Sequence, residues 1–165
     1  NGEFVRNPKE DLVKVAVVER HQGTGNVACG FLKGYGIKEG AVALSVAHDS
    51  HNIIVVGVND EEMEFAVNSL IAQEGGIVLV KEGKVIEQMP MPIAGLMSDQ
   101  SGEWVDEKLT SIHEKAYTEL GICGDVEPVM TLCFMSLAVI PEIKLTDMGL
   151  FDVTTFSFIP VEISR

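Results

Sequence analysis

A polar segment, residues 48–52, interrupts two apolar stretches in the first third of the chain. It consists of His48, Asp49, Ser50, His51 and Asn52. The flanking stretches, Ala41–Val46 and Ile53–Val58, have the composition of buried strands. A loop between two inner strands presents its side chains at the edge of a sheet, where binding residues often lie. We therefore interpret this segment as a candidate site. The alternative is a polar turn whose side chains bond to their own backbone.

The same segment raises the question of a metal site. Two histidines three residues apart, with Asp49 between them, are possible zinc ligands. A structural zinc site needs four ligands, however, and a catalytic one needs three from the protein. His21 and His113 have no ligand-like spacing to this pair. We therefore predict no metal site in this chain.

A second group of chemically capable residues follows the predicted strand Val13–Val18. Glu19, Arg20 and His21 are consecutive, and an arginine between such neighbours could orient an anionic or polar heterocyclic ligand. The alternative is a surface ion pair that contributes little to stability. Gly23–Ala28 then matches the dinucleotide fingerprint G-x-G-x-x-A. The residues after it are too rich in glycine for the helix that this fingerprint requires, so we interpret the glycines as turn residues.

The elements that must position these residues are predicted from periodicity and from capping signals. The expected helices are a first one that begins at Asn59 and ends at Gly75, a second over 103–120 and a third over 129–139. Further strands are expected at Val27–Leu32, Ile77–Val80, Lys84–Glu87 and Val153–Val161. This order predicts an α+β fold: a single domain with a mostly buried mixed β-sheet and about three helices packed on it. We expect residues 1–10 to be an N-terminal arm or a linker remnant, and residues 11–165 to be the domain.

Composition excludes several classes of function. Twelve Lys and Arg stand against 25 Asp and Glu among 165 residues, a net charge of −13, which argues against nucleic-acid binding. Apolar runs such as Ile53–Val58 are far shorter than the roughly 20 residues that span a membrane. Three scattered cysteines do not form a disulfide framework and indicate a reducing cytoplasm. The chain begins at Asn1 without a methionine, so we expect it to be part of a larger protein.

Several blocks of the sequence resemble the C-terminal domain of bacterial and archaeal adenine deaminase. The resemblance extends from about Asp11 onward. The matching blocks are Glu19–His21, Gly23–Asn26, Val46–Gly57, Pro92–Ser98 and Ile140–Asp147. It implies a parent enzyme of the amidohydrolase superfamily that hydrolyses adenine to hypoxanthine and ammonia in purine salvage. In that family a β/α barrel carries a Mn, Fe or Zn centre.

The resemblance also implies what this chain lacks. A barrel of this kind typically needs about 250 residues, so it cannot fit in this chain, and no metal ligand is carried over. We expect no cofactor here, no turnover by the isolated chain, and the barrel, adenine and further copies of the protein as partners. Residues 19–21 and 48–52 would shape or close the purine pocket, or fix the interface with the barrel. The alternatives are a non-catalytic structural or oligomerisation domain and a stand-alone module that binds a small ligand.

Overall fold

A six-stranded antiparallel sheet forms the centre of the molecule. The computed structural model describes residue 7 and residues 9–161. The strand order is β2-β1-β4-β3-β5-β6, and every pairing in it is antiparallel. The strands are β1 (Leu12–Val18), β2 (Val27–Lys33), β3 (Ala41–Leu44), β4 (Ile53–Gly57), β5 (Gly76–Lys81) and β6 (Lys84–Pro90). Three short strands form a second sheet: β7 (Ile143–Thr146), β8 (Gly149–Asp152) and β9 (Ser157–Ile159).

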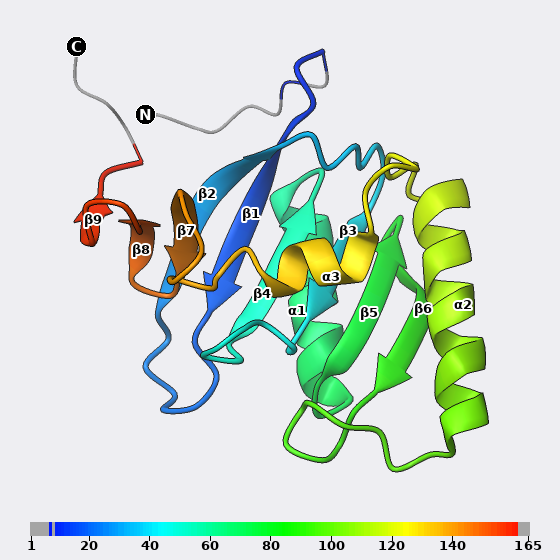
Figure 1. Cartoon of the computed structure of the whole chain (residues 1–165). Helices are drawn as coiled ribbons and strands as arrows, with labels where there is room; N and C mark the ends of the chain where they lie inside the picture. Colours follow the sequence, from blue (N-terminus) through cyan, green and yellow to red (C-terminus); the bar gives the residue numbers. More distant parts are fainter. Residues whose placement is uncertain (1–6, 8, 162–165) are drawn as a thin grey trace.

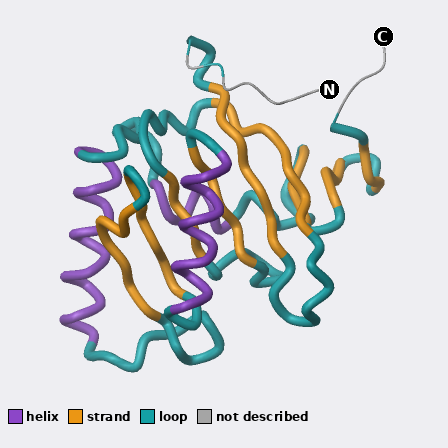
Figure 2. Tube along the Cα trace, turned by 180° about the vertical axis from the view of Figure 1, so that it is seen from behind, coloured by secondary structure: helices purple, strands orange, loops and turns teal. Residues whose placement is uncertain are grey.

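Helices cover both faces of the large sheet, so its central strands are fully buried. Helix α1 (Asp60–Ala72) covers one face, the face seen in Figure 2. Helices α2 (Gly102–Thr118) and α3 (Pro128–Cys133) lie on the other face together with β7 (Figure 1). All residues of β3 and β4 are buried, as their apolar runs predict. The α+β class with three helices is therefore confirmed, whereas the expected mixed sheet is antiparallel in all its described pairs.

The first two helices follow the sequence pattern closely. The side chain of Asn59 accepts a hydrogen bond from the Glu62 backbone N–H at 2.8 Å, which caps α1 as expected. Met63, Ala66 and Leu70 of α1 are buried against the sheet. In α2 the buried residues are Ile112 and Ala116, two of the positions that the apolar stripe predicts. No helix in the described part of the chain is long and apolar enough to cross a membrane.

Two predictions in the last third are wrong in their extent. The third helix ends at Cys133 instead of residue 139. The carbonyls that would continue it accept hydrogen bonds from other segments. The Cys133 carbonyl accepts from His48 N–H at 2.9 Å, and the Met135 carbonyl accepts from Leu145 N–H at 3.0 Å. The final strand is only Ser157–Ile159, because Asp152 holds residues 153–155 in a turn by accepting from Thr154 N–H at 2.8 Å. Strands β7 and β8 were not expected.

The predicted N-terminal arm lies largely outside the described residues, since residues 1–6 and 8 are not described. The Asn7 carbonyl accepts from Glu10 N–H at 3.2 Å and from Leu12 N–H at 3.1 Å, so the chain enters β1 through a tight turn. Gly23 and Gly25, with φ angles of +63° and +74°, lie just before strand β2, which begins at Val27 where the fingerprint requires a helix. The interpretation of these glycines as turn residues, rather than as a nucleotide-binding fingerprint, is therefore confirmed.

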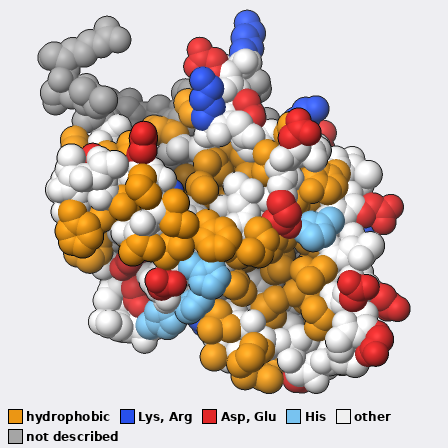
Figure 3. Space-filling view, viewed as in Figure 1, with side chains coloured by type: hydrophobic (Ala, Val, Ile, Leu, Met, Phe, Trp, Pro, Cys, Tyr) orange, Lys and Arg blue, Asp and Glu red, His pale blue; other side chains and the backbone are white. Residues whose placement is uncertain are grey.

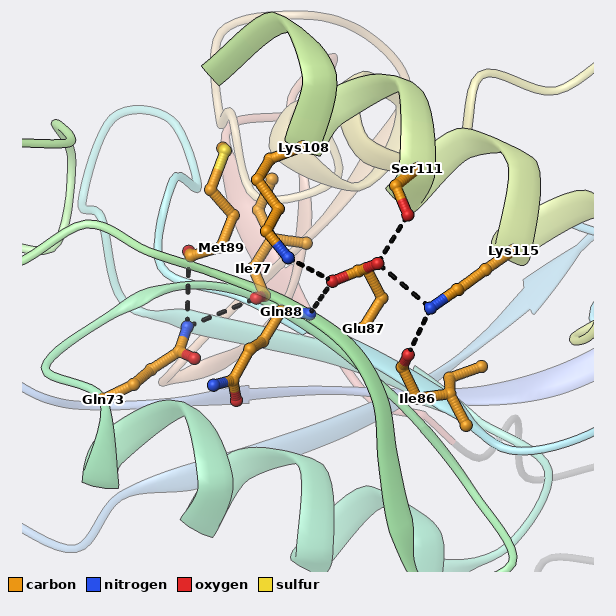
Figure 4. A network of polar contacts seen from close by, with 9 residues as sticks. All are labelled: Gln73, Ile77, Ile86, Glu87, Gln88, Met89, Lys108, Ser111 and Lys115. Atoms are coloured by element: carbon orange, nitrogen blue, oxygen red, sulfur yellow. Dashed lines mark hydrogen bonds and ion pairs between the residues drawn. The ribbon is translucent and has the colours of Figure 1, made fainter. Parts of the chain in front are cut away.

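A cluster of polar contacts holds α2 on β6. Glu87 of β6 has a side chain that is only 9% exposed. Its carboxylate accepts from Lys108 Nζ at 2.8 Å and from Ser111 Oγ at 2.5 Å, and it pairs with Lys115 Nζ at 3.1 Å (Figure 4). Burial alone would raise the pKa of Glu87, but these three partners outweigh it and lower the pKa to about 2. The carboxylate is therefore charged at neutral pH and stabilises the fold.

We predict that Glu87→Gln destabilises the protein by about 1–3 kcal/mol at pH 7, because it removes a buried ion pair. Since the pKa is lowered on folding, this contribution is present above about pH 4.5 and is lost as pH falls toward 2. Urea unfolding at pH 7 and at pH 3 measures it. The matched control is Glu107→Gln, which removes an exposed carboxylate of α2. Equal stability of the two variants at pH 7 would contradict this account.

Candidate functional site

The antiparallel pairing of β1 and β4 brings the two candidate segments together. Val18, the last residue of β1, is opposite Ile53, the first residue of β4. Residues 19–21 therefore leave the sheet beside residues 48–52, at one edge formed by strand ends. This proximity follows from strand register and not from closeness in sequence, since about thirty residues separate the segments. We call the surface formed by residues 19–24, 48–52 and 92–98 the polar edge.

Arg20 joins the three segments of the polar edge. Its Nε donates to the His51 carbonyl at 2.5 Å, and its Nη2 donates to the Ala94 carbonyl at 2.8 Å. Its backbone N–H donates to Asn52 Oδ1 at 3.3 Å. Burial lowers the pKa of the guanidinium from its usual value. Because two donors of the guanidinium are occupied by backbone carbonyls, Arg20 acts as a positioning residue for the loops around it.

The third segment, residues 92–98, is one of the blocks that resemble the family, but it was not among the predicted site residues. Gly95 has a φ of +72°, and a Cβ at this position would lie 2.7 Å from Arg20 Nη1. The Gly95 carbonyl accepts from Ser45 Oγ at 2.5 Å, and Ser45 Oγ in turn accepts from Gly76 N–H at 2.8 Å. Ser45 is fully buried at the end of β3. The loop is thus fixed from both sides, by Arg20 and by Ser45.

Glu19 organises the turn that follows β1. Its carboxylate accepts hydrogen bonds from the backbone N–H groups of His21, Gln22 and Thr24, and from the Thr24 hydroxyl at 3.0 Å. These bonds, that from the Thr24 backbone above all, outweigh desolvation and lower the pKa of Glu19 to about 2. Glu19 therefore stays charged across the physiological range. These four bonds all lie within its own turn, which makes Glu19 a positioning residue like Arg20.

Three histidines lie at the polar edge, each held differently. The His48 ring stacks on Phe134 with centroids 5.3 Å apart and meets the His51 ring edge-on at the same distance. The Nε2 atom of His21 is 2.7 Å from the Ser50 carbonyl. Burial lowers the pKa of His51, and the neighbouring His48 and Arg20 lower it further. His51 is therefore neutral at pH 7, and its Nδ1 is buried without a hydrogen-bond partner among the described residues.

The remaining predicted residues divide into exposed and buried ones. Asp49 has a side chain that is 81% exposed, 3.7 Å from His48 Nδ1. Ser50 Oγ accepts from Asn52 N–H at 3.4 Å, as expected if part of the segment is a polar turn. Asn52 is 4% exposed and bonds to Arg20, so it belongs to the framework of the site. His21, His48, Asp49 and Ser50 are the residues that the framework presents outward.

The polar edge does not have the arrangement of a metal centre. The described residues contain no group of three His, Cys, Asp or Glu side chains that could hold a metal ion. The His48 and His51 rings face each other edge to face instead of converging on a common point. A cavity of about 310 Å³ opens beside the edge on the α1 side, lined by Glu19, Arg20, Ser45, Ile53 and Leu70 among others. The edge thus offers hydrogen-bonding groups and an adjoining hollow, but no set of metal ligands.

Comparison with known proteins identifies the family. The family model described as "Adenine deaminase C-terminal domain" matches residues 1–157. The chain belongs to this family. An adenine deaminase 2 from Desulfotalea psychrophila is 73% identical over 162 residues, which are 98% of this chain and 28% of that protein. An adenine deaminase from Ligilactobacillus salivarius is 52% identical over 163 residues, and one from Bacillus velezensis is 48% identical over 159.

The match confirms the resemblance inferred from the sequence blocks. It also shows how much of the length of its relatives this adenine deaminase C-terminal domain covers. The chain spans about 28% of the length of the curated relatives that it matches. The family match begins at residue 1, so it includes the ten residues that we interpreted as an arm.

We predict that Gly95→Ala destabilises the domain by at least about 1 kcal/mol more than Gly83→Ala does. Both glycines have positive φ angles, +72° and +67°, but a Cβ at Gly83 meets nothing within 4 Å, whereas at Gly95 it displaces Arg20. Gly83→Ala is therefore a matched control for backbone strain. Chemical denaturation of each variant, alone and combined with Arg20→Met, measures the difference.

The double-mutant cycle separates the contact from the strain. If Arg20 holds the loop, the excess cost of Gly95→Ala disappears in the Arg20→Met background. An excess that persists unchanged without Arg20 would show that this contact does not organise the polar edge.

Proposed function

We propose that this chain is the C-terminal domain of an adenine deaminase, an enzyme that hydrolyses adenine to hypoxanthine and ammonia in purine salvage. The relatives that it matches over nearly its whole length are named adenine deaminases, which supports the proposal. The partner is then the barrel of the same enzyme, and the substrate is adenine. The family resemblance implies a Mn, Fe or Zn centre in that barrel. The described residues of this chain include no group of three His, Cys, Asp or Glu side chains that could hold a metal ion.

The role that we propose for the polar edge is to shape or close the adenine pocket. The observation that carries this role is the convergence of three segments on Arg20, which holds them with bonds of 2.5 and 2.8 Å. Such a framework pre-organises the groups that it presents, and pre-organised groups lose less entropy on binding. Adenine has ring nitrogens that accept hydrogen bonds and an amine that donates them. Asp49, Ser50 and the ring nitrogens of His48 and His21 are suitable partners.

A cytoplasmic location and a homo-oligomeric state belong to the same proposal. The cysteines support the location, since Cys29, Cys123 and Cys133 are all unpaired, as is usual in a reducing compartment. The competing function is that of a non-catalytic structural domain, in which the polar edge only fixes the interface with the barrel. The two functions differ in whether an exposed side chain of the edge affects turnover.

We predict that Asp49→Ala in the full-length enzyme lowers kcat/KM for adenine by about 10- to 100-fold, the factor for one lost hydrogen bond to a charged group. Because the Asp49 side chain is 81% exposed, the same change should alter stability by less than about 0.5 kcal/mol. Steady-state kinetics and thermal unfolding measure the two effects. The control is Asp125→Ala, an exposed carboxylate in the loop before α3, at the opposite end of the sheet.

Kinetics that are the same for Asp49→Ala, Asp125→Ala and the unchanged enzyme would reject a substrate role for Asp49 and favour the structural function. A loss of activity that merely follows a loss of stability would do the same.

The isolated chain is predicted to release no ammonia from adenine with Mn²⁺, Fe²⁺ or Zn²⁺. Hydrolysis at neutral pH needs a nucleophilic water whose pKa is lowered to about 7, and a pocket alone leaves that barrier in place. The assay follows ammonia over many equivalents of adenine. Multiple turnovers that survive repurification and disappear in a His48→Ala, His51→Ala double variant would contradict the prediction.

A further inference from the structure

The last part of the chain carries an unusual share of the exposed apolar side chains. Seven of the fifteen large hydrophobic residues that are exposed in the described structure lie within residues 139–161. They are Val139, Ile140, Ile143, Met148, Phe156, Phe158 and Val161. Phe156 and Met148 are 78% and 72% exposed, the highest values in the set. Figure 3 shows hydrophobic side chains gathered over β7–β9 on the same face as α3. Ile143 and Val161 line a hollow beside Phe31 and Leu32 of β2, on the inner side of the small sheet. We call the other five residues the C-terminal apolar face.

Strand geometry explains why this face is apolar. One side of the small sheet packs on β2, where Leu150 and Leu145 lie within 3.3 and 3.6 Å of the position that a Cβ of Gly30 would take. Side chains alternate between the two sides of a strand, so Phe151, next to Leu150, points away from β2. Phe158 is paired with Phe151, and their rings are 5.3 Å apart. Phe156 contacts Phe151 at 5.2 Å. The outer side of the small sheet thus carries a cluster of three aromatic rings, with Lys144 beside them, opposite Phe151 in the pairing of β7 with β8.

An aromatic cluster on the outer side of a sheet is normally covered by another part of the protein or by a partner. Strands of four, four and three residues also form a sheet too small to be stable by itself. Packing on β2 covers the inner side only. Solvent-exposed aromatic side chains at Phe156 and Phe158 are unfavourable in a free domain and are typical of an interaction surface. The described residues of this chain do not cover the outer side of the small sheet. We therefore expect another polypeptide segment to cover it.

The C-terminal apolar face is physically connected to the polar edge. His48 stacks on Phe134, and the Ser136 hydroxyl donates to the His48 carbonyl at 3.2 Å. One residue away, the Met135 carbonyl accepts from Leu145 N–H in β7 at 3.0 Å. In Figure 3 histidine side chains border the hydrophobic surface on the same side of the molecule. A partner that covers the apolar face can therefore reach the polar edge as well.

We infer that the C-terminal apolar face docks the part of the same polypeptide that precedes this domain, and so sets the polar edge against it. The inference rests on the proposed function. The relatives are much longer than this chain, which covers only 28% of their length. The family is named for the C-terminal domain, so the additional length lies mainly before this domain. A contact within one polypeptide needs no recognition between molecules, and interfaces between domains commonly bury several hundred Å² or more.

Hydroxyl-radical footprinting of the isolated chain and of the full-length protein tests the docking directly. We expect Met148, Phe156 and Phe158 to be oxidised at least three times more slowly in the full-length protein. Phe65, in α1 on the other side of the large sheet and 37% exposed, is the internal control and should react equally in both. Equal rates at all four residues would overturn the inference.

A pair of substitutions extends the test to docking strength. Phe158→Ser in the full-length protein should increase protease cleavage between this domain and the preceding part several-fold, whereas Phe65→Ser should not. Circular dichroism of the isolated Phe158→Ser chain shows whether the domain itself still folds. Cleavage that is equal in the two variants, with both domains folded, would contradict the inference.

Three further outcomes separate this inference from its alternatives. Protection that appears in the isolated chain and rises with its concentration would make a second copy the occupant, and would overturn the assignment. If protection is absent in the full-length protein while Asp49→Ala still lowers kcat/KM, the docking face is wrong and the proposed function stands. If protection is present and Asp49→Ala has no effect, the docking stands and the substrate role of Asp49 fails.

Discussion

The candidate site depends on the hydrogen bonds of one guanidinium group. Arg20 donates to the carbonyls of His51 and Ala94, which lie 31 and 74 residues away in the chain. A lysine offers a single charged point on a flexible stem, whereas the planar guanidinium has donors in fixed directions that suit two carbonyls from different loops. Gly95 is required next to it because any side chain there would displace the guanidinium. Without this contact, the loop of residues 92–98 would be held by Ser45 alone and would no longer be tied through Arg20 to residues 48–52.

The rigidity of the polar edge comes from the sheet behind it. β3 and β4 are buried on both faces, by α1 on one side and by α2 and α3 on the other, so their ends are fixed in position. Ser45 extends this framework beyond β3 by bonding to Gly95 and Gly76. The small sheet continues the molecule past β2 and leaves its aromatic side exposed. The fixed loops of the polar edge thus lie beside the exposed C-terminal apolar face, which supports the proposal that this domain completes a site on a neighbouring domain.

Much of this arrangement could be predicted from the sequence because its signals are local. Runs of β-branched residues predict β1 and β4, and a short apolar run predicts β3. The Asn59 cap predicts α1, and the polar segment 48–52 is recognisable between two buried strands. The misses depend on distant contacts. The helix expected over 129–139 stops at Cys133 because its carbonyl bonds to His48. Strands β7 and β8 have four residues each and, unlike β3, no continuous apolar run, so they carry too little signal to detect. Arg20 was recognised as a candidate, but its role as a positioning residue follows from carbonyls that no sequence pattern reveals.

The central claim is that the polar edge faces the adenine pocket of the complete enzyme. A crystal structure of the full-length protein with a purine bound tests it most directly. This account predicts that Asp49, or another outward group of the edge among His21, His48 and Ser50, lies within hydrogen-bond distance of the purine, directly or through one water. It also predicts that Arg20 still bonds to the carbonyls of His51 and Ala94. A purine enclosed entirely by the preceding domain, with residues 19–21 and 48–52 exposed to solvent on the far side, would contradict the account.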